Sequence, residues 1–285
     1  MVYVATPHSH HYQNVKSALL AKKHVLCEKP FTVNSKQADL LVSLAQKQNV
    51  FLLEAVWTRF FPLTLSIRDL IRNGEIGHVH RVTADFSTVV NKQEKGLHHR
   101  MFNPELAGGS LLDLGVYSLN WLILAIYDAQ NQRKGEPSVI GTLVKVPETG
   151  VDEAATVVLG WDDAIGIATS SVSIPTAPDE ANPALAGPAV KVCGSKATIT
   201  IPYPGVYQPS EYSIHPHSGG KVVKKTFPIP GKGMFWQADE TARCIRDGKK
   251  ESDILPVSET LLVMRIMDRV REQNGFKYPE SIEKV

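Results

Sequence analysis

The sequence predicts an α/β piece with a parallel sheet over residues 1–55, followed by a larger α+β piece over residues 56–285 with an open, mostly antiparallel sheet flanked by helices. Up to about residue 55, short apolar runs alternate with helical segments, a rhythm that indicates βαβ units. Between residues 139 and 227, strand-like runs follow one another with turn residues between them and no helical pattern, which is typical of antiparallel pairing.

The first piece contains three short apolar runs and two helical segments. Strands are predicted at Val2–Ala5, Val25–Cys27 and Val50–Leu53, and the first helix at Tyr12–Ala21. Ser35 can cap the second helix, whose apolar stripe is Ala38, Leu41, Val42 and Ala45.

The second piece opens with a helix, a strand and a long apolar helix. The first helix is predicted from Leu63 to Arg72, because Asn73-Gly74 is a typical C-terminal stop. Val79 to Val89 alternates like a half-buried strand, and Gly108-Gly109 precedes a helix that reaches about Tyr127.

Seven strand-like runs and two helices complete the chain. The strands are expected at Val139–Val146, Ala155–Trp161, Ile165–Ile174, Val190–Cys193, Thr198–Ile201, Tyr212–Ile214 and Val222–Phe227. A mobile loop rich in proline and alanine is expected at Pro175–Pro188. The closing amphipathic helices are expected at Phe235–Arg246 and Ser258–Gln273.

Charge and cysteine content argue against several classes of protein. The 31 basic and 29 acidic side chains give a formal net charge of +2 without a block of like charge, so we expect no nucleic-acid and no membrane partner. The most apolar stretch, Trp121 to Tyr127, is too short to span a bilayer, and no signal peptide opens the sequence. Three cysteines without CxxC spacing fit a reducing compartment, and we expect a cytoplasmic protein.

Lys29 stands at the end of the second predicted strand, in the stretch His24-Val25-Leu26-Cys27-Glu28-Lys29-Pro30. In an open α/β sheet, ligands bind beyond the carboxyl ends of the strands. An acid and an ammonium displayed there, before a proline that fixes the turn, are placed for chemistry. On spacing alone, a solvated strand end is an equally good interpretation.

Asp113 and Tyr117 stand four residues apart in the predicted long helix, so their side chains share a face. The ordinary pKa of a tyrosine is about 10, and a nearby ammonium lowers that pKa by stabilising the phenolate. Lys29 would be that ammonium if the two pieces meet along a cleft. Spacing alone favours the alternative of a core tyrosine with a satisfied hydroxyl.

Clustered histidines raise the question of a metal site. His8, His10 and His11 lie close together, as do His98 and His99. Adjacent residues on a helix do not face one point, and no carboxylate or cysteine is spaced to complete a ligand set. We therefore expect no metal.

Three motifs stand in order along the chain. They are Val4-Ala5-Thr6-Pro7 with His11 and Glu28-Lys29-Pro30, then Gly108-Gly109-Ser110-Leu111-Leu112-Asp113-Leu114-Gly115-Val116-Tyr117, then Ala242-Arg243-Cys244-Ile245 with Gly248-Lys249, Ile266-Met267-Asp268 and Tyr278-Pro279. Together they resemble the Gfo/Idh/MocA oxidoreductase family. The likeness runs from residue 2 to about residue 283. Tyr117 stands where many members carry His, and together with Glu54–Pro62 it resembles a narrower group, the dimeric dihydrodiol dehydrogenases and the NADP-dependent D-xylose 1-dehydrogenases.

The resemblance implies site residues and their roles. Tyr117 would exchange a proton with the substrate hydroxyl, Lys29 would support the phenolate and the oxyanion, and Asp113 would orient the sugar or the lysine. The implied substrate candidates are Trp57, Arg59 and Arg100, although an aromatic cluster is more often core or a subunit contact and a loop arginine is commonly just exposed. The implied cofactor-lining positions are Thr6, Pro7, His11, Glu28, Lys29 and Pro30.

The resemblance also implies an activity. The cofactor would be NADP, with NAD as the alternative, and the best-matched reaction is oxidation of D-xylose to D-xylono-1,5-lactone. Oxidation of a trans-1,2-dihydrodiol is the second possibility. A homodimer formed through the C-terminal sheet is expected, with a small sugar or diol as the other partner.

One departure from the family pattern favours a third interpretation. A Rossmann half opens with a Gly-rich turn that lets the backbone approach a pyrophosphate, and the first glycine of this sequence is Gly74. We therefore expect a partial Rossmann domain in an N-terminally truncated chain, where cofactor binding can be lost. Such a chain could be catalytically silent and act only as a dimerisation module.

Overall fold

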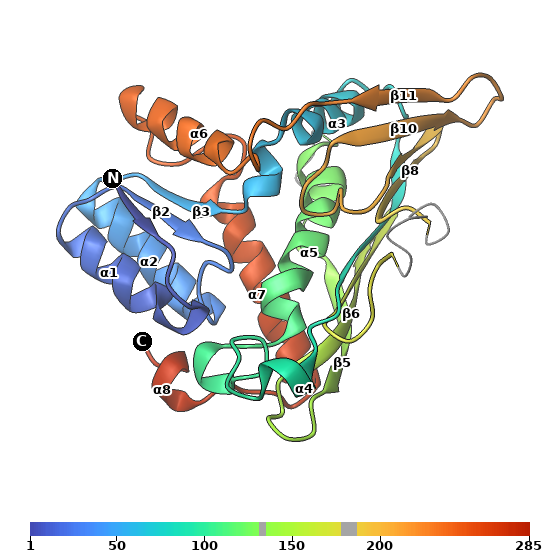
Figure 1. Cartoon of the computed structure of the whole chain (residues 1–285). Coiled ribbons are helices and arrows are strands. Elements are labelled where there is room, and N and C mark those ends of the chain that lie inside the picture. The colour runs from blue at the N-terminus through green and yellow to red at the C-terminus, as the bar shows by residue number, and fades with distance from the viewer. Residues whose placement is uncertain (131–134, 178–186) are drawn as a thin grey trace.

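Two sheets organise the chain in the computed structural model, which describes residues 1–130, 135–177 and 187–285 (Figure 1). The smaller sheet is parallel, with the order β1-β2-β3. The larger sheet has the order β11-β10-β9-β8-β4-β7-β6-β5 in the described part of the chain. The predicted division into a parallel and an open, mostly antiparallel sheet is confirmed.

The small sheet is built from two consecutive strand–helix units followed by a third strand, as predicted. Its elements are β1 (Val2–Val4), η1 (His8–His10), α1 (His11–Leu20), β2 (Val25–Glu28), α2 (Ser35–Gln48) and β3 (Leu52–Ala55). The expected cap at Ser35 is wrong by one residue. Asn34 is extended and its side chain accepts the amide hydrogen of Gln37 at 3.0 Å, whereas Ser35 is already helical.

The large sheet has one parallel pair. β4 pairs parallel with β7 and antiparallel with β8, and all other pairs among the described strands are antiparallel. Its strands are β4 (Val79–Ser87), β5 (Ser138–Lys145), β6 (Asp152–Trp161), β7 (Ala164–Ser171), β8 (Val190–Gly194), β9 (Ala197–Ile201), β10 (Glu211–Pro216) and β11 (Val223–Thr226). Of the loop expected at Pro175–Pro188, residues 178–186 lie outside the described residues.

A central helix runs from Leu111 to Asp128 beside the large sheet. It begins and ends with π-helical turns, η4 (Leu111–Gly115) and η5 (Ile123–Asp128), around α5 (Val116–Leu122). The apolar helical segment Pro104–Asp128 is longer than the stretch expected from the sequence, and by length and composition it could cross a membrane. Its whole apolar window is buried inside the protein, so it forms the core.

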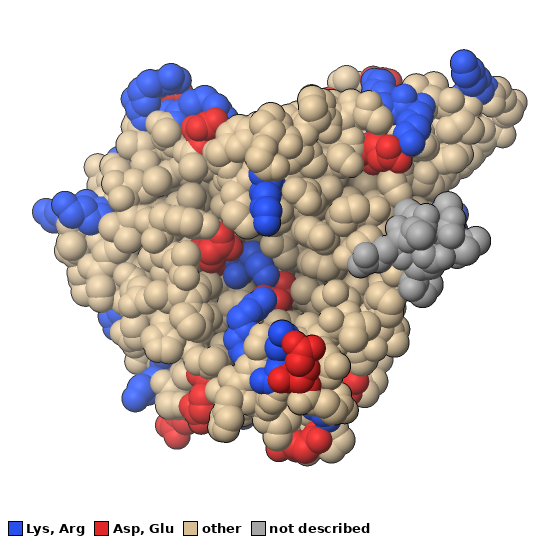
Figure 2. Space-filling model, in the orientation of Figure 1, with Lys and Arg blue, Asp and Glu red and all other residues tan. Residues whose placement is uncertain are grey.

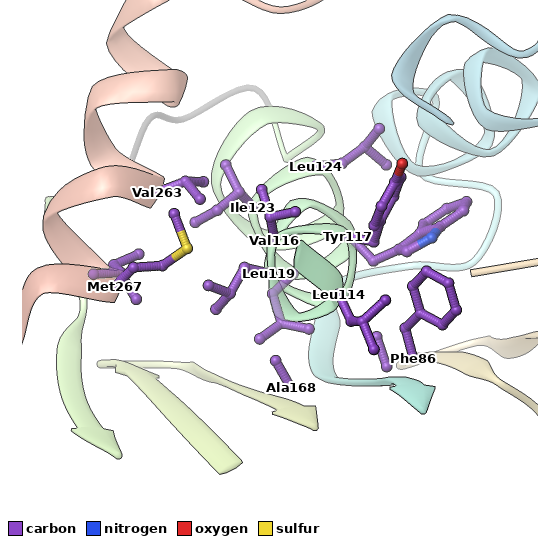
Figure 3. Close-up of a cluster of buried hydrophobic side chains, with 14 of the residues drawn as sticks. Phe86, Leu114, Val116, Tyr117, Leu119, Ile123, Leu124, Ala168, Val263 and Met267 are labelled. Carbon is purple, nitrogen blue, oxygen red and sulfur yellow. The ribbon is translucent and has the colours of Figure 1, made fainter. Parts of the chain in front are cut away.

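One of the remaining helices, α7 (Val257–Gln273), joins the two sheets. α7 packs against β5 of the large sheet and against α2 and β3 of the small one, so both sheets share one apolar core. Figure 3 shows Val263 and Met267 of α7 on one side of the central helix and Tyr117 beside Phe86 on the other. The remaining helices are η2 (Trp57–Phe60), α3 (Pro62–Arg72), α4 (Lys92–Lys95), η3 (Pro104–Leu106), α6 (Phe235–Arg246), α7 (Val257–Gln273) and α8 (Glu280–Glu283).

Candidate functional site

A cavity of about 380 Å³ lies where the carboxyl ends of β1 and β2 face η3 and the central helix. Figure 2 shows a hollow between the two parts of the molecule in which acidic and basic side chains gather. The segments after β1 and β2 line it on one side and Arg100, η3 and the central helix on the other, as expected for a ligand site at strand ends. The cavity is lined by Ala5, Thr6, Pro7, His8, His11, Glu28, Lys29, Arg100, Leu106 and Asp113.

Lys29 reaches from the end of β2 to the central helix. Its Nζ atom donates to the carbonyl oxygen of Asp113 at 2.6 Å and to Oδ1 of the same residue at 3.0 Å. The two pieces of the chain therefore meet along a cleft, which was the condition for a chemical role of Lys29.

Asp113 is the centre of a cluster of positive groups. Arg100 contacts both of its carboxylate oxygens, at 2.8 and 3.2 Å, and Nε2 of His8 lies 3.2 Å from Oδ1. Burial would raise the pKa of Asp113, but Lys29, His8 and Arg100 together hold this pKa well below its usual range. The carboxylate stays ionised and fixes the three donors around the cavity.

Tyr117 lies behind this cluster. Its hydroxyl oxygen accepts a hydrogen bond from Nε1 of Trp57 at 2.7 Å, and Nζ of Lys29 lies 4.9 Å from the centre of its ring. Burial raises the pKa of Tyr117 well above its ordinary value, and the bond from Trp57 only partly opposes this. The expectation that Lys29 lowers this pKa is wrong here, because the ammonium faces the ring and Asp113 rather than the phenol oxygen.

Most of the predicted cofactor positions line the cavity. Thr6, Pro7, His11, Glu28 and Lys29 are among its lining residues, and Pro30 is not. The hydroxyl of Tyr3 donates to the carboxylate of Glu28.

His11 connects two of the loops beside the cavity. Its Nδ1 faces the carbonyl oxygen of Pro30 and its Nε2 that of Thr6, both at 2.8 Å. Burial lowers the pKa of His11 to about 4, so the ring is neutral near pH 7. A neutral imidazole has one N–H, so only one of the two contacts is a hydrogen bond at a time.

The three residues predicted to contact the substrate lie in different places in the structure. Arg100 lines the cavity and half of its side chain is exposed, while Trp57 contacts Tyr117. Arg59 lies elsewhere, because its guanidinium contacts Glu259 at 2.7 Å and the carbonyl of Ile254 at 2.9 Å and is almost fully buried. The structure thus gives Arg59 an internal ion pair and no place in the cavity.

Sequence reasoning missed one residue of the cavity, His8, and one residue that supports the central helix, Asp152. His8 follows Pro7 shortly after β1, and a polar residue beyond a strand end is a signal for a ligand site. This histidine was considered only as a metal ligand. Asp152, at the start of β6, accepts the Leu111 amide hydrogen at 2.5 Å and the Ser110 hydroxyl at 2.9 Å. It caps the central helix, and no local sequence pattern links it to that helix.

The described residues fit one end of a dinucleotide better than the other. The polar groups of Glu28, Lys29 and Thr6 around the cavity suit a nicotinamide and its ribose. Residues 1–73 contain no glycine for a pyrophosphate turn. Among the residues that the structure describes, no group of three or more His, Cys, Asp or Glu side chains could hold a metal.

In this chain, the strand ends of a parallel sheet and the part with the open sheet share one cavity. This is the arrangement of a two-part oxidoreductase with a dinucleotide-binding type of domain. The chain belongs to the Gfo/Idh/MocA oxidoreductase family. Residues 1–55 match the model of the oxidoreductase family with an NAD-binding Rossmann fold, and residues 64–200 match that of the GFO/IDH/MocA C-terminal domain.

The sequence matches to two named relatives extend over nearly the whole chain. It is 44% identical to the D-xylose 1-dehydrogenase (NADP(+)) of Hypocrea jecorina, over 99% of this chain and 74% of that protein. It is 32% identical to the trans-1,2-dihydrobenzene-1,2-diol dehydrogenase of Danio rerio, over 99% and 79%. The aldose-aldose oxidoreductase of Caulobacter crescentus has the same fold, with a TM-score of 0.78 and 23% identity over 95% of this chain and 77% of that one.

Proposed function

We propose that this protein is an NADP-dependent dehydrogenase that oxidises a sugar hydroxyl, and that it converts D-xylose to D-xylono-1,5-lactone. The relative at 44% identity that carries this activity in its name supports the substrate and the cofactor. The observation that carries the proposal is the meeting of Lys29 and Asp113 at one cavity between the two parts of the chain, with the ring of Tyr117 4.9 Å from the Lys29 ammonium behind them.

The contacts of the three residues support a role for each. Tyr117 would accept the proton of a substrate hydroxyl in its phenolate form and become a neutral phenol; the bond from Trp57 lowers the pKa of Tyr117 and favours the phenolate, against the effect of burial. Lys29 stabilises the oxyanion that develops on the substrate, and Asp113 holds the ammonium at the edge of the cavity. A nicotinamide cofactor, when bound, supplies the hydride acceptor. Thr6, Pro7, His11, Glu28 and Pro30 would hold its nicotinamide end, and Arg100 would contact the substrate.

Oxidation of a dihydrodiol is the second candidate. Phe86 and Tyr207 pack around Tyr117, with ring centres 5.4 and 6.5 Å from it, and Trp57 lies beside them. Flat apolar side chains of this kind suit a substrate with a six-membered hydrocarbon ring. The relatives at 31–32% identity with dihydrodiol dehydrogenase names support this alternative.

A third candidate is a catalytically silent dimerisation module. The exposed apolar side chains Ile140, Val144 and Ile165 on β5 and β7 support it. In every candidate we propose a homodimer formed through the large sheet, a domain boundary after Ala55 and a cytoplasmic location. The free thiols of Cys27, Cys193 and Cys244 support the last point.

Two assays of the purified chain test the proposal. Formation of NADPH from NADP, and of NADH from NAD, is followed with D-xylose, other pentoses and a trans-dihydrodiol. The highest kcat/KM with D-xylose and NADP supports the proposal, and a preference for the dihydrodiol selects the alternative. NADPH is also titrated against the fluorescence of the 4 tryptophans, where no saturable change would favour the silent module.

A further inference from the structure

Glu54 is a buried carboxylate that the proposed reaction does not use. It lies in β3, is 3% exposed and begins the motif Glu54–Pro62. Its Oε1 accepts the backbone amide hydrogen of Phe31 at 3.0 Å, and its Oε2 accepts the hydroxyl hydrogen of Thr260 at 2.8 Å. Each carboxylate oxygen therefore accepts one hydrogen bond, Oε1 from the loop after β2 and Oε2 from α7.

The Phe31 amide belongs to the turn that carries Lys29. Phe31 is two residues beyond Lys29, and between them the carbonyl of Pro30 faces the buried ring of His11 at 2.8 Å. The turn is thus held at consecutive residues by side chains from two different elements, α1 and β3. Lys29 itself remains at the cavity, where it contacts Asp113.

We infer that Glu54 is a positioning residue that fixes the Lys29 turn against α7 and so sets the place of the Lys29 ammonium opposite Asp113. Only the expected effect on turnover rests on the proposed function; the positioning of the Lys29 turn does not. α7 also packs against the central helix that carries Asp113. Through its bond to Thr260, Glu54 therefore holds the Lys29 turn against the same packed helices that position Asp113, the partner of Lys29. A shift of about 1 Å in such a frame is enough to lower turnover by on the order of 100-fold.

The charges around Glu54 make this contact dependent on pH. Cys27 and Glu28 of β2 face it from one side and Arg59 of η2 from another, while α7 offers the uncharged Thr260. Burial raises the pKa of Glu54 to about 7, against the opposing effects of Thr260, Phe31 and Arg59. The ionised form makes two charge-assisted bonds, and the protonated form makes weaker neutral ones.

Glu54→Gln tests the inference because it keeps the shape and removes the charge. In ¹⁵N-labelled wild-type protein, the Phe31 amide resonance should shift with a midpoint near pH 7, and in Glu54→Gln it should not titrate. The Lys29 ammonium resonance, assigned with Lys29→Arg, should move in Glu54→Gln. Where the chain turns over substrate, kcat should fall by about tenfold or more, with KM changing by less than about twofold.

Thr260→Val and Thr241→Val form a matched pair. Both threonines are buried in a C-terminal helix, and the Thr241 hydroxyl donates to the Gln237 carbonyl within α6. Thr260→Val should move the Lys29 resonance, and Thr241→Val should leave it in place. Unchanged Lys29 resonances in Glu54→Gln and Thr260→Val, or a Phe31 amide that does not titrate, would overturn the inference. Shifted resonances in a chain without dehydrogenase activity would uphold it and sink only the proposed function.

Discussion

The Nζ atom of Lys29 lies 3.0 Å from Oδ1 of Asp113, although the two residues are 84 positions apart in the chain. One comes from the end of a parallel strand and the other from the first turn of the central helix. This contact joins the two parts of the protein at the wall of the cavity. It also places the ammonium over the ring of Tyr117, which brings the three candidate catalytic residues together.

Replacing Tyr117 by Phe should lower kcat by on the order of 10²-fold to 10⁴-fold, because it removes the group that exchanges the substrate proton. The Trp57 N–H would lose its acceptor, at a cost of about 1–3 kcal/mol in stability. Steady-state kinetics and thermal unfolding measure the two effects. Tyr212→Phe is the control, since its buried hydroxyl contacts Ser66 on the far side of the protein, and equal losses in both variants would contradict the assignment.

Asp113→Asn should destabilise the protein by about 2–4 kcal/mol near pH 7, because it leaves Lys29 with a neutral partner. Arg100 is half exposed and adds little to this figure. The folded-state pKa of Asp113 is depressed, so its contribution is present above the ordinary carboxyl pKa of about 3.9 and is lost as the pH falls through the folded value. Urea unfolding should therefore show a gap between wild type and variant that closes in acid; a gap independent of pH would contradict this.

Asp152 should show the opposite dependence on pH. Burial raises its pKa to about 6, against the bonds from Leu111 and Ser110. Between about pH 4 and 6 the folded state holds a proton that the unfolded state has released, so stability falls as the pH rises through this window. In Asp152→Asn this slope should disappear from the urea-unfolding profile, and an unchanged slope would show that another group is responsible.

Gly109→Ala should cost about 2–4 kcal/mol. A Cβ atom there would lie 2.1 Å from Oδ1 of Asp152, and the backbone has a φ of +118°. Gly150 is the matched control, with a φ of +75° and nothing within 4 Å of its Cβ position, so Gly150→Ala should lose only about 1–2 kcal/mol of backbone strain. Equal losses of unfolding free energy in the two variants would mean that the Asp152 contact does not constrain Gly109.

Arg59→Met should affect stability more than substrate binding. It removes the guanidinium that Glu259 contacts at 2.7 Å in the interior, and breaking a buried pair costs about 3–5 kcal/mol. Arg100→Met, at the cavity, should raise KM for the substrate by more than about fivefold with a small change in Tm. A raised KM with unchanged Tm in Arg59→Met would restore Arg59 to the substrate pocket.

The order of elements could be predicted because each has its own local signal. Asn73-Gly74 ends α3 where it was expected, and α6 has the predicted bounds, Phe235–Arg246. The cap of α2 was misplaced because Asn34 and Ser35 are both good capping residues and only the backbone geometry distinguishes them. The apolar stretch of the central helix was underestimated because the polar residues Asp113, Ser118 and Asn120 interrupt it in the sequence, although all three are buried.

By itself, the sequence determined the two sheets, the strand end that carries Lys29 and the helix that carries Asp113 and Tyr117, since periodicity and turn residues act over a few positions. Only the tertiary structure decided which charges meet. His8 and Arg100 on Asp113, Trp57 on Tyr117 and Arg59 on Glu259 are contacts between distant segments. A pKa depends on burial and on charges a few ångströms away. The sequence could suggest Lys29 as a neighbour of Tyr117, but it could not show that burial outweighs the Trp57 bond and the Arg100 charge in setting the pKa of Tyr117.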